Sequence, residues 1–454
     1  MKGVSEALLT DLYQLTMAHA YFELGMSDVA VFELFVRRLP DTRHFLLAAG
    51  LEQMLEYVED LKFSEADLAF LSTLGAFNPD FLDYLATVRF SGSVHAMPEG
   101  TPFFANEPLV RVTAPIVEAQ LLESRLLNIV HFQTMIASKA ARCVIAAAGR
   151  QLADFGMRRA HEADAALFAA RAAYLAGFDA TATVEGGRRF GIPLSGTLAH
   201  SFIEAHDRED EAFRHFVLSA RGPTTLLIDT YDTQRALQSV IALAQELRER
   251  GSEQHGIHAV RIDSGDLAAQ ARMARAELDA RGCRDVRIVL SGGLDEHVID
   301  AMVRSAVPVD AFGVGTALAV SADAPALDMV YKLQEYAGRP RRKTSPDKAT
   351  WPGAKQVFRE RAPGGEYLRD QVAPHDEPAP GEPLLAELMR NGRRTVPLPS
   401  LLETRKYCAA EMQALPAQLR GLTAVEATYP VSIADSLQAM AAGLDAAVLG
   451  RSGA

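Results

Sequence analysis

The chain contains little cysteine and no long apolar run, and these absences exclude several classes of protein. The three cysteines, Cys143, Cys283 and Cys408, are far apart and form no Cys-x-x-Cys pair, which excludes a disulfide scaffold and a thiolate zinc site. No apolar run approaches the roughly 18 residues that a membrane span needs. The 454 residues carry a net charge of -12, which argues against a broad nucleic-acid or anionic-membrane surface. We therefore expect a cytoplasmic protein that has neither nucleic acid nor a membrane as a partner.

Two further absences concern nucleotide and amine chemistry. No Gly-x-x-x-x-Gly-Lys-Ser/Thr sequence occurs, so any nucleoside triphosphate would bind without a P-loop. No lysine stands at the end of a proposed strand, which disfavours a Schiff-base aldolase. What is present is an ordinary composition for a folded protein, with 48% hydrophobic and 23% charged residues.

A repeated pattern of strand, polar loop and helix runs from about residue 140 to residue 330. Each short apolar run ends in polar or glycine residues, and a segment of helical periodicity follows it. Such repeats imply parallel strands with right-handed crossovers, and five or more in succession favour a (β/α) barrel over a doubly wound sheet. The repeats begin with apolar runs within 152–156, 226–230, 258–263, 286–293 and 311–316.

The segments on either side of these repeats have a different character. Residues 91–115 have β patterning, 116–140 have the periodicity of one long helix, and 335–400 are rich in Gly, Pro and basic residues, with an apparent linker at 373–384. We expect residues 1–135 to begin a discontinuous α+β domain. Residues 136–330 would form a barrel-like catalytic domain, and residues 331–454 would complete the first domain and add a helical tail.

The apolar run at 258–262 carries the clearest candidates for chemistry. Arg261 lies within it, and Asp263 and Asp266 follow as a helical pattern begins at Leu267. A half-buried arginine is costly unless it meets an anion, and its pairs with phosphate or carboxylate are bidentate. Asp263 could accept ribose hydroxyls or hold Mg²⁺ through water. Helix capping explains Asp266 well and Asp263 less well.

Two glycine-containing loops follow later strands, Ser291-Gly292-Gly293 and Gly313-Val314-Gly315-Thr316. Glycine lets backbone N–H groups approach a phosphate, and the start of a helix adds partial positive charge. Barrels often bind phosphate in the loops after their last two strands. We therefore expect a phosphate at these loops, against the alternative that the glycines only make tight turns.

His200 and Tyr13 have side chains suited to phosphorus chemistry and to ring stacking. Residues 193–196 interrupt the local periodicity before His200, and Thr197 is placed to cap the helix that follows. A neutral imidazole is a competent nucleophile toward phosphorus at pH 7. The alternatives are that His200 is structural and that Tyr13, which stands among leucines, belongs to the core.

Several motifs taken together resemble the nicotinate phosphoribosyltransferase family. They occur in that family's order over about residues 8–360, and the basic segment 343–359 is similar to it as well. Each motif is short, but their combination is specific. The motifs are Leu8 through Met17, Phe32 through Pro40, Asp154-Phe155-Gly156-Met157-Arg158-Arg159, Gly196 through Ser201, Arg261 through Leu267 and Gly313-Val314-Gly315-Thr316.

The resemblance implies a fold and a reaction. The fold would be α/β, an irregular (β/α) barrel of the type II phosphoribosyltransferase kind with a second, discontinuous α+β domain. The reaction would convert nicotinate and phosphoribosyl pyrophosphate to nicotinate mononucleotide and pyrophosphate, the first step of NAD salvage from nicotinate. A ligase-class enzyme of this family would couple it to ATP hydrolysis through a phosphohistidine, use Mg²⁺ and work as a homodimer with shared active sites.

The resemblance also implies roles for individual residues. Tyr13, from the partner chain, and Phe155 would sandwich the pyridine ring, while Thr197 and Arg261 would contact the nicotinate. Asp263 would hold ribose or the shell of its metal ion, and His200 would be the phosphorylated histidine. The remaining residues would bind phosphate, Arg158 near the ring and Gly292, Gly293, Gly315 and Thr316 around the 5-phosphate.

One departure from the family pattern and three alternatives remain at this stage. Residues 180–184, Ala-Thr-Ala-Thr-Val, stand where Gly-Thr-Ser-Asn-Val is expected. The first alternative is nicotinamide phosphoribosyltransferase, which shares two of the motifs, although Thr10-Asp11-Leu12-Tyr13 and the block from Gly196 to Ser201 favour the nicotinate enzyme. The second is a non-catalytic barrel that binds nucleotides, and the third is a general phosphosugar barrel suggested by the glycine loops alone.

Overall fold

The internal contacts of the chain divide it into two units. The computed structural model describes residues 5–222, 224–251, 256–346, 348–423 and 428–452. Unit 1 comprises residues 1–135 and 326–454, and unit 2 comprises residues 136–325. Unit 1 is therefore discontinuous in sequence, while unit 2 is a single segment.

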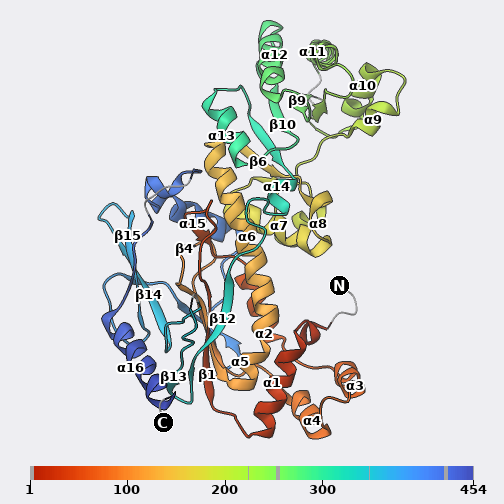
Figure 1. The fold of residues 1–454 in the computed structure, drawn as a ribbon. Coiled ribbons are helices and arrows are strands. Elements are labelled where there is room, and N and C mark those ends of the chain that lie inside the picture. Colours follow the sequence, from red (N-terminus) through yellow and green to blue (C-terminus); the bar gives the residue numbers. More distant parts are fainter. Residues whose placement is uncertain (1–4, 223, 252–255, 347, 424–427, 453–454) are drawn as a thin grey trace. The chain divides into compact units, whose positions relative to one another are not determined.

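Unit 2 is built on a six-stranded parallel sheet with the strand order β7-β6-β11-β10-β9-β8. The sheet is curled into a half-barrel, so the predicted fold class is confirmed. Figure 1 shows strands β6, β9 and β10 with the helices of this unit around them. The strands are β6 (Gln151–Asp154), β7 (Ala180–Thr181), β8 (Thr224–Leu227), β9 (Ile257–Ile262), β10 (Arg287–Ser291) and β11 (Ala311–Val314).

The helices of unit 2 follow the strands in the predicted alternation. In α11 and α12 the buried apolar residues are those that the periodicity selects, with Leu267, Ala271, Ala274 and Leu278 buried in α12. The two helices lie side by side (Figure 1). The elements are η2 (Met157–Arg159), α7 (Ala163–Ala176), α8 (Val184–Phe190), α9 (His200–Glu204), α10 (Glu209–Ser219), α11 (Thr233–Glu249), α12 (Leu267–Ala280), α13 (Glu296–Arg304) and α14 (Thr316–Ala319).

The single long helix predicted for residues 116–140 is wrong in its bounds. The structure has a short α5 (Ile116–Leu121) and a long α6 (Glu123–Ala147), with Leu122 between them. The apolar periodicity continues across Leu122, which is fully buried, so the pattern alone could not reveal the break. The boundary between the two units falls within α6.

Unit 1 contains an antiparallel seven-stranded sheet with the order β13-β12-β1-β5-β3-β17-β18. A second sheet has the order β16-β14-β15-β19, and β2 pairs with β4. The strands are β1 (Val29–Val36), β2 (Leu46–Leu47), β3 (Ser93–Ala96), β4 (Pro102–Phe103), β5 (Pro108–Pro115), β12 (Met329–Tyr336), β13 (Arg339–Pro340), β14 (Lys355–Arg361), β15 (Tyr367–Pro374), β16 (Glu382–Pro383), β17 (Ala386–Arg390), β18 (Arg393–Arg394) and β19 (Val431–Ile433).

The helices of unit 1 come from both ends of the chain. Two of them begin with a capping box, in which a serine and the carboxylate three residues later cap each other's N–H groups, at Ser64 and at Ser400. The predicted linker at 373–384 is partly wrong, because Ala373 and Pro374 end β15. The helical elements are η1 (Glu6–Leu8), α1 (Leu12–Glu23), α2 (Leu51–Glu59), α3 (Glu65–Thr73), α4 (Pro79–Thr87), α15 (Leu401–Ala414), η3 (Ala417–Arg420) and α16 (Asp435–Ser452).

A buried charged cluster lies in unit 1 between β5, β14 and β15. Arg359 and Asp370 form an ion pair of 2.6 Å that is fully buried on both sides. Tyr429 donates to Asp370 (2.8 Å), and the backbone N–H of Phe104 donates to Glu107 (2.8 Å). Burial, reinforced by the charge of Asp370 and opposed by Arg359, raises the pKa of Glu107 well above its ordinary value of 4.5. Burial therefore disfavours the charged form of Glu107 in the folded state.

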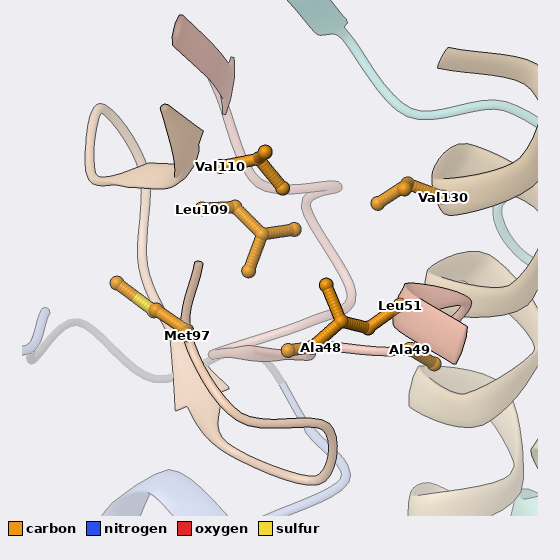
Figure 2. A pocket seen from close by; sticks show the side chains of 7 residues that line it. All are labelled: Ala48, Ala49, Leu51, Met97, Leu109, Val110 and Val130. Carbon is orange, nitrogen blue, oxygen red and sulfur yellow. The ribbon is translucent and has the colours of Figure 1, made fainter. Parts of the chain in front are cut away.

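A small cavity in unit 1 is lined only by apolar side chains. Its volume of about 10 Å³ is about what one water molecule needs. Figure 2 shows that its lining presents carbon and one sulfur and no polar side-chain atom. The cavity is a packing defect with no features of a ligand site. Its lining is Ala48, Ala49, Leu51, Met97, Leu109, Val110 and Val130.

The described helices also bear on the membrane question. None of the helices within the described ranges combines the length and the apolar character that crossing a membrane requires. The three cysteines are free and buried.

Candidate active site

Side-chain hydrogen bonds join the carboxyl ends of three neighbouring strands in unit 2. Arg261 of β9 donates from Nε to Ser291 Oγ at the end of β10 (2.8 Å) and from Nη2 to Asp263 Oδ1 just beyond β9 (2.6 Å). Ser291 also donates to Asp263 (2.5 Å). On the other side Asp229, which follows β8, accepts from the backbone N–H of Asp263 (2.9 Å) and from Ser264 Oγ (2.6 Å). Asp263 is therefore held from both neighbouring strands.

The guanidinium of Arg261 is mostly shielded from water but retains donors for a ligand. Its side chain is 14% exposed, and Nη1 donates to Thr197 Oγ1 (2.9 Å). An arginine carries five N–H groups. Three of them donate to Ser291, Thr197 and Asp263, so one on Nη1 and one on Nη2 remain among the described contacts. Two terminal N–H groups are what a carboxylate needs for a bidentate contact.

Phe155 lies over this guanidinium. The Cζ atom of Arg261 is 5.2 Å from the centroid of the Phe155 ring, within the range of a cation–π contact. The ring reaches this place because residue 313 has no side chain, since a Cβ atom on Gly313 would come within 2.4 Å of the ring. The glycine at 313 is therefore explained by the aromatic ring, which differs from the phosphate interpretation of that loop's glycines.

Asp154 anchors the segment that carries Phe155. Its two carboxylate oxygens accept from the backbone N–H of Gly156 (2.8 Å) and from Thr181 Oγ1 at the end of β7 (2.7 Å). Burial raises the pKa of Asp154 above its ordinary value, and these two hydrogen bonds act in the opposite direction. Phe155 itself donates its backbone N–H to Val314 of β11 (2.9 Å). The aromatic ring is thus placed by both strands that flank β6.

The first glycine loop is required by its backbone. Gly292 has φ +89°, and a Cβ atom there would lie 1.9 Å from the backbone oxygen of Asp263. Gly293 has φ +64° and open space around it. Both glycines are exposed, and they lead into the start of α13. In the second loop Gly315 precedes Thr316, which is exposed and begins α14.

His200 begins α9 and contacts the residue that follows Asp229. Its Nδ1 atom is 3.0 Å from Thr230 Oγ1. The prediction that Thr197 caps this helix is wrong, because the N-cap residue is Ala199 and the Thr197 hydroxyl donates to Leu198 O and accepts from Arg261. Thr197 therefore holds Arg261 and does not cap α9. His200 therefore contacts a residue that follows β8, and Arg261 contacts a residue in the loop before α9.

The other candidates make no side-chain hydrogen bond with this group among the described residues. Arg158 is exposed in η2, three positions after Phe155. Asp266 caps α12 by accepting from Ala269 N (3.0 Å), which confirms the capping interpretation. Tyr13 belongs to unit 1, at the start of α1, and is 49% exposed. Burial and the charges of Glu123 and Asp11 raise its pKa.

Asp229 and Ser291 were not assigned roles from the sequence. Both stand at strand ends that the sequence identified, so the signal for them was the position and not the residue type. One oxygen of Asp229, Oδ1, is buried without a hydrogen-bond partner among the described residues. An unpaired carboxylate oxygen beside Asp263 is suited to a hydroxyl group or a hydrated cation.

The segment that departs from the family pattern is part of the scaffold. Thr181 Oγ1 accepts from the backbone N–H of Thr183 (3.0 Å) as it donates to Asp154, and Ala182 N donates to Asp154 O (2.8 Å). The Thr183 hydroxyl is buried and unpaired within the described part of the chain. The departure therefore leaves the support of Phe155 intact.

The curled parallel sheet, with its polar groups gathered at the carboxyl ends of the strands, defines the class of type II phosphoribosyltransferases. Models of three successive domains match the chain. They are the nicotinate phosphoribosyltransferase N-terminal domain over residues 8–131, the nicotinate phosphoribosyltransferase family over residues 150–349 and the C-terminal domain over residues 350–441. The chain belongs to the nicotinate phosphoribosyltransferase family.

Known relatives agree with this assignment. The chain is 48% identical to a nicotinate phosphoribosyltransferase of Mycobacterium tuberculosis over 95% of its own length and 92% of that protein. It is 42% identical to the enzyme of that name from Bacillus subtilis over 79% and 74% of the two chains. The crystal structure of human nicotinic acid phosphoribosyltransferase matches with a TM-score of 0.84 at 30% identity, covering 96% of this chain and 99% of the human one.

Proposed function

We propose that this chain transfers the phosphoribosyl group of phosphoribosyl pyrophosphate to the ring nitrogen of nicotinate, releasing pyrophosphate and forming nicotinate mononucleotide for NAD synthesis. The observation that carries the proposal is the shielded guanidinium of Arg261 beneath the ring of Phe155, with two N–H groups left for an anion. A flat aromatic acid matches both features at once, since its ring stacks on Phe155 while its carboxylate meets Arg261.

The transfer itself needs positioning more than acid–base catalysis. The lone pair of the pyridine nitrogen attacks C1 of the ribose as pyrophosphate leaves, so no side chain has to remove a proton. Holding the nitrogen in line with C1 is the main task of Phe155 and Arg261. We assign Gly292, Gly293, Gly315 and Thr316 to the 5-phosphate, because their backbone N–H groups lie in the loop before α13 and at the start of α14.

The donor set near Asp263 fits a magnesium ion carried by pyrophosphate. Within the described ranges no group of three or more His, Cys, Asp or Glu side chains could hold a metal alone. Mg²⁺ commonly takes only one or two carboxylates and completes its shell with water and substrate phosphates. Asp263 and the unpaired Oδ1 of Asp229 would supply those carboxylates. When bound, the ion would neutralise charge on the departing pyrophosphate.

We assign the coupling to ATP to His200. Its Nδ1 atom is hydrogen-bonded to the hydroxyl of Thr230, so Nε2 is the nitrogen that can attack the terminal phosphorus of ATP. The new N–P bond forms as the P–O bond to ADP breaks, and water later hydrolyses the phosphohistidine to inorganic phosphate. A phosphoryl group on His200 would add about -1.5 to -2 charges. Arg158 is exposed and follows Phe155 by three positions, so we assign it to neutralising anions near the ring.

We further propose a homodimer in which Tyr13 of one copy completes the ring site of the other. The support is that Tyr13 and its neighbour Leu12 are exposed by 49% and 57% at the start of α1, and adjacent exposed apolar side chains are suited to an interface. Mixing a Tyr13→Ala variant with an Arg261→Met variant tests the sharing. Each variant alone should be nearly inactive, and mixed dimers should recover activity because one of their two sites is then intact.

The direct test of the reaction is product formation from labelled phosphoribosyl pyrophosphate, with nicotinate or nicotinamide as the acceptor and with or without ATP. We expect nicotinate mononucleotide, stimulation by ATP and label from ATP on His200. Preference for the amide would indicate nicotinamide phosphoribosyltransferase instead, and absence of pyrophosphate release with every acceptor would indicate a binding protein. We also place the protein in the reducing cytosol, on the support of three separate, free cysteines.

A further inference from the structure

A buried cluster of four charged residues lies in unit 2, and none of the four is assigned to a substrate. Lys139 and Arg142 come from α6, Glu296 from α13 and Asp323 from the segment after α14. The Nζ atom of Lys139 is 2.5 Å from Glu296 Oε2 and 2.9 Å from Asp323 Oδ1. The Nε atom of Arg142 is 2.9 Å from Glu296 Oε1. We call these four residues the Lys139 cluster.

The Lys139 cluster combines two cations and two anions that are almost fully shielded from water. The side chains of Lys139 and Arg142 are 2% and 4% exposed, and those of Glu296 and Asp323 are 0% and 11% exposed. Two cations therefore face two anions. Burial raises the pKa of Glu296, but the hydrogen bonds from Lys139 and Arg142 and the charge of Lys139 outweigh it and leave that pKa below its ordinary value. The carboxylate is thus ionised at neutral pH.

The position of the two anions in the chain connects the cluster to both glycine loops. Glu296 is the first residue of α13 and follows Gly293 by three positions. Asp323 follows Thr316 by seven positions, after the single turn of α14. One ammonium group, that of Lys139, contacts both anions. The segments that continue from the two loops are therefore tied to the same point on α6.

Stability alone is a poor explanation for four buried charges. The cost of removing charged groups from water often equals or exceeds the attraction between them, and apolar residues of similar size frequently stabilise as well. The neighbours of the cluster on α6, Ala140, Ala141 and Cys143, are apolar and fully buried. Unlike apolar packing, an ion cluster fixes the direction and distance between the groups that it joins.

We propose that the Lys139 cluster sets the separation of the two glycine loops and so adjusts them to the 5-phosphate of phosphoribosyl pyrophosphate. Lys139, Glu296 and Asp323 are positioning residues in this scheme, since they act through the loops and do not touch the substrate. The inference rests on the proposed function, which assigns the 5-phosphate to these loops. A phosphate that is held by both loops at once is sensitive to small changes in their spacing.

Two variants test the inference, one by disrupting the whole cluster and one by releasing a single loop. Glu296→Gln removes the charge that holds both cations, and Asp323→Asn releases the second loop while leaving the contact between Lys139 and Glu296. We expect the KM for phosphoribosyl pyrophosphate to rise by about tenfold or more in the first and by about threefold to tenfold in the second. The KM for nicotinate and the value of kcat should stay within about twofold, because the lost contact acts equally on the ground and transition states.

A matched control separates positioning from loss of stability. Glu33 and Lys355 form another buried ion pair, 2.8 Å long with exposures of 0% and 4%, but they lie in unit 1. Glu33→Gln should lower Tm by an amount comparable to Glu296→Gln and leave the KM for phosphoribosyl pyrophosphate unchanged. Calorimetric titration with ribose 5-phosphate gives a second readout that needs no turnover, and its affinity should fall in parallel with the rise in KM.

The outcomes are distinct. If folded Glu296→Gln and Asp323→Asn proteins show a lower Tm but an unchanged KM and unchanged binding of ribose 5-phosphate, the cluster is only structural and the inference is overturned. If Glu296→Gln does not fold, Asp323→Asn decides alone. If the unaltered protein binds ribose 5-phosphate but forms no nicotinate mononucleotide, the proposed function fails while weaker binding in the variants still supports the inference.

Discussion

Replacement of Arg261 by lysine tests the main feature of the proposed site. The guanidinium meets Ser291, Thr197 and Asp263 through Nε, Nη1 and Nη2 and keeps one N–H on each terminal nitrogen. Lysine keeps the positive charge but has a single nitrogen, which cannot reach these partners and also form a fork toward a carboxylate. Arg261→Lys therefore removes the bidentate geometry without removing the charge.

The contacts of Arg261 set the expected rise in the KM for nicotinate. A hydrogen bond to a charged group contributes about 1.5–3 kcal/mol, and 1.4 kcal/mol corresponds to about tenfold in an equilibrium constant. Asp263 already lies 2.6 Å from Nη2 and balances the charge of Arg261, which weakens the attraction for a second anion. We therefore expect the lower end of the range, and so a rise of roughly tenfold in the KM for nicotinate.

The assay is steady-state formation of nicotinate mononucleotide at saturating phosphoribosyl pyrophosphate, with nicotinamide as a parallel acceptor. The discrimination between acid and amide should fall with the affinity for the acid, because only the acid engages the fork. Arg287→Lys is the matched control. Arg287 begins β10, at the opposite edge of the same sheet, and contacts Gln151 (3.1 Å), so its replacement should change neither KM.

The reasoning is refuted if folded Arg261→Lys keeps its KM for nicotinate within about twofold of the unaltered protein. It is equally refuted if the KM for nicotinamide rises by the same factor as that for nicotinate, since the carboxylate would then not be what Arg261 recognises.

Three further changes have defined outcomes. His200→Ala should abolish stimulation by ATP and labelling from ATP while slow turnover without ATP persists, and stimulation that survives the change would contradict the assignment. Gly292→Ala should nearly abolish activity and lower the free energy of unfolding in urea by about 1–3 kcal/mol more than Gly282→Ala, because a Cβ atom at 292 meets Asp263 O at 1.9 Å whereas 282, with a similar φ, has open space. Burial raises the pKa of Glu107. The contribution of Glu107 to the free energy of unfolding is therefore complete below pH 4.5 and is lost as the pH rises through the folded-state pKa. The decline is no more than about 1.4 kcal/mol per pH unit. Glu107→Gln should flatten that decline in unfolding experiments between pH 5 and 8, and equal slopes for the two proteins would contradict it.

The sequence predicted the strand ends of unit 2 because short apolar runs followed by helical periodicity have a single simple arrangement. The carboxyl ends of parallel strands lie at one edge of a sheet, so Arg261, Asp263 and Ser291 were expected at the same edge once the strands were identified. The resemblance to a known family supplied what periodicity could not, namely that Phe155 and Thr197 belong to the same place.

What the sequence could not predict depends on the order of the strands and on single side-chain contacts. The role of Asp229 follows from β8 lying beside β9, and the local sequence does not state that order. Gly313 has the same residue type as a phosphate-binding glycine, yet the ring of Phe155 accounts for it. The break at Leu122 is hidden because a buried leucine continues the apolar periodicity on both sides.

Side-chain hydrogen bonds join β8, β9 and β10, so the site forms only when these strands pair in the correct register. Arg261 stands opposite Leu227 on one neighbouring strand and Val289 on the other. If β9 slipped by a single residue, every side chain on it would turn to the opposite face, and the guanidinium would leave Phe155 for the helix-covered side. A chain folded with that error would keep most of its secondary structure and lose the proposed nicotinate site, so substrate affinity would reveal a misfolded fraction that circular dichroism does not.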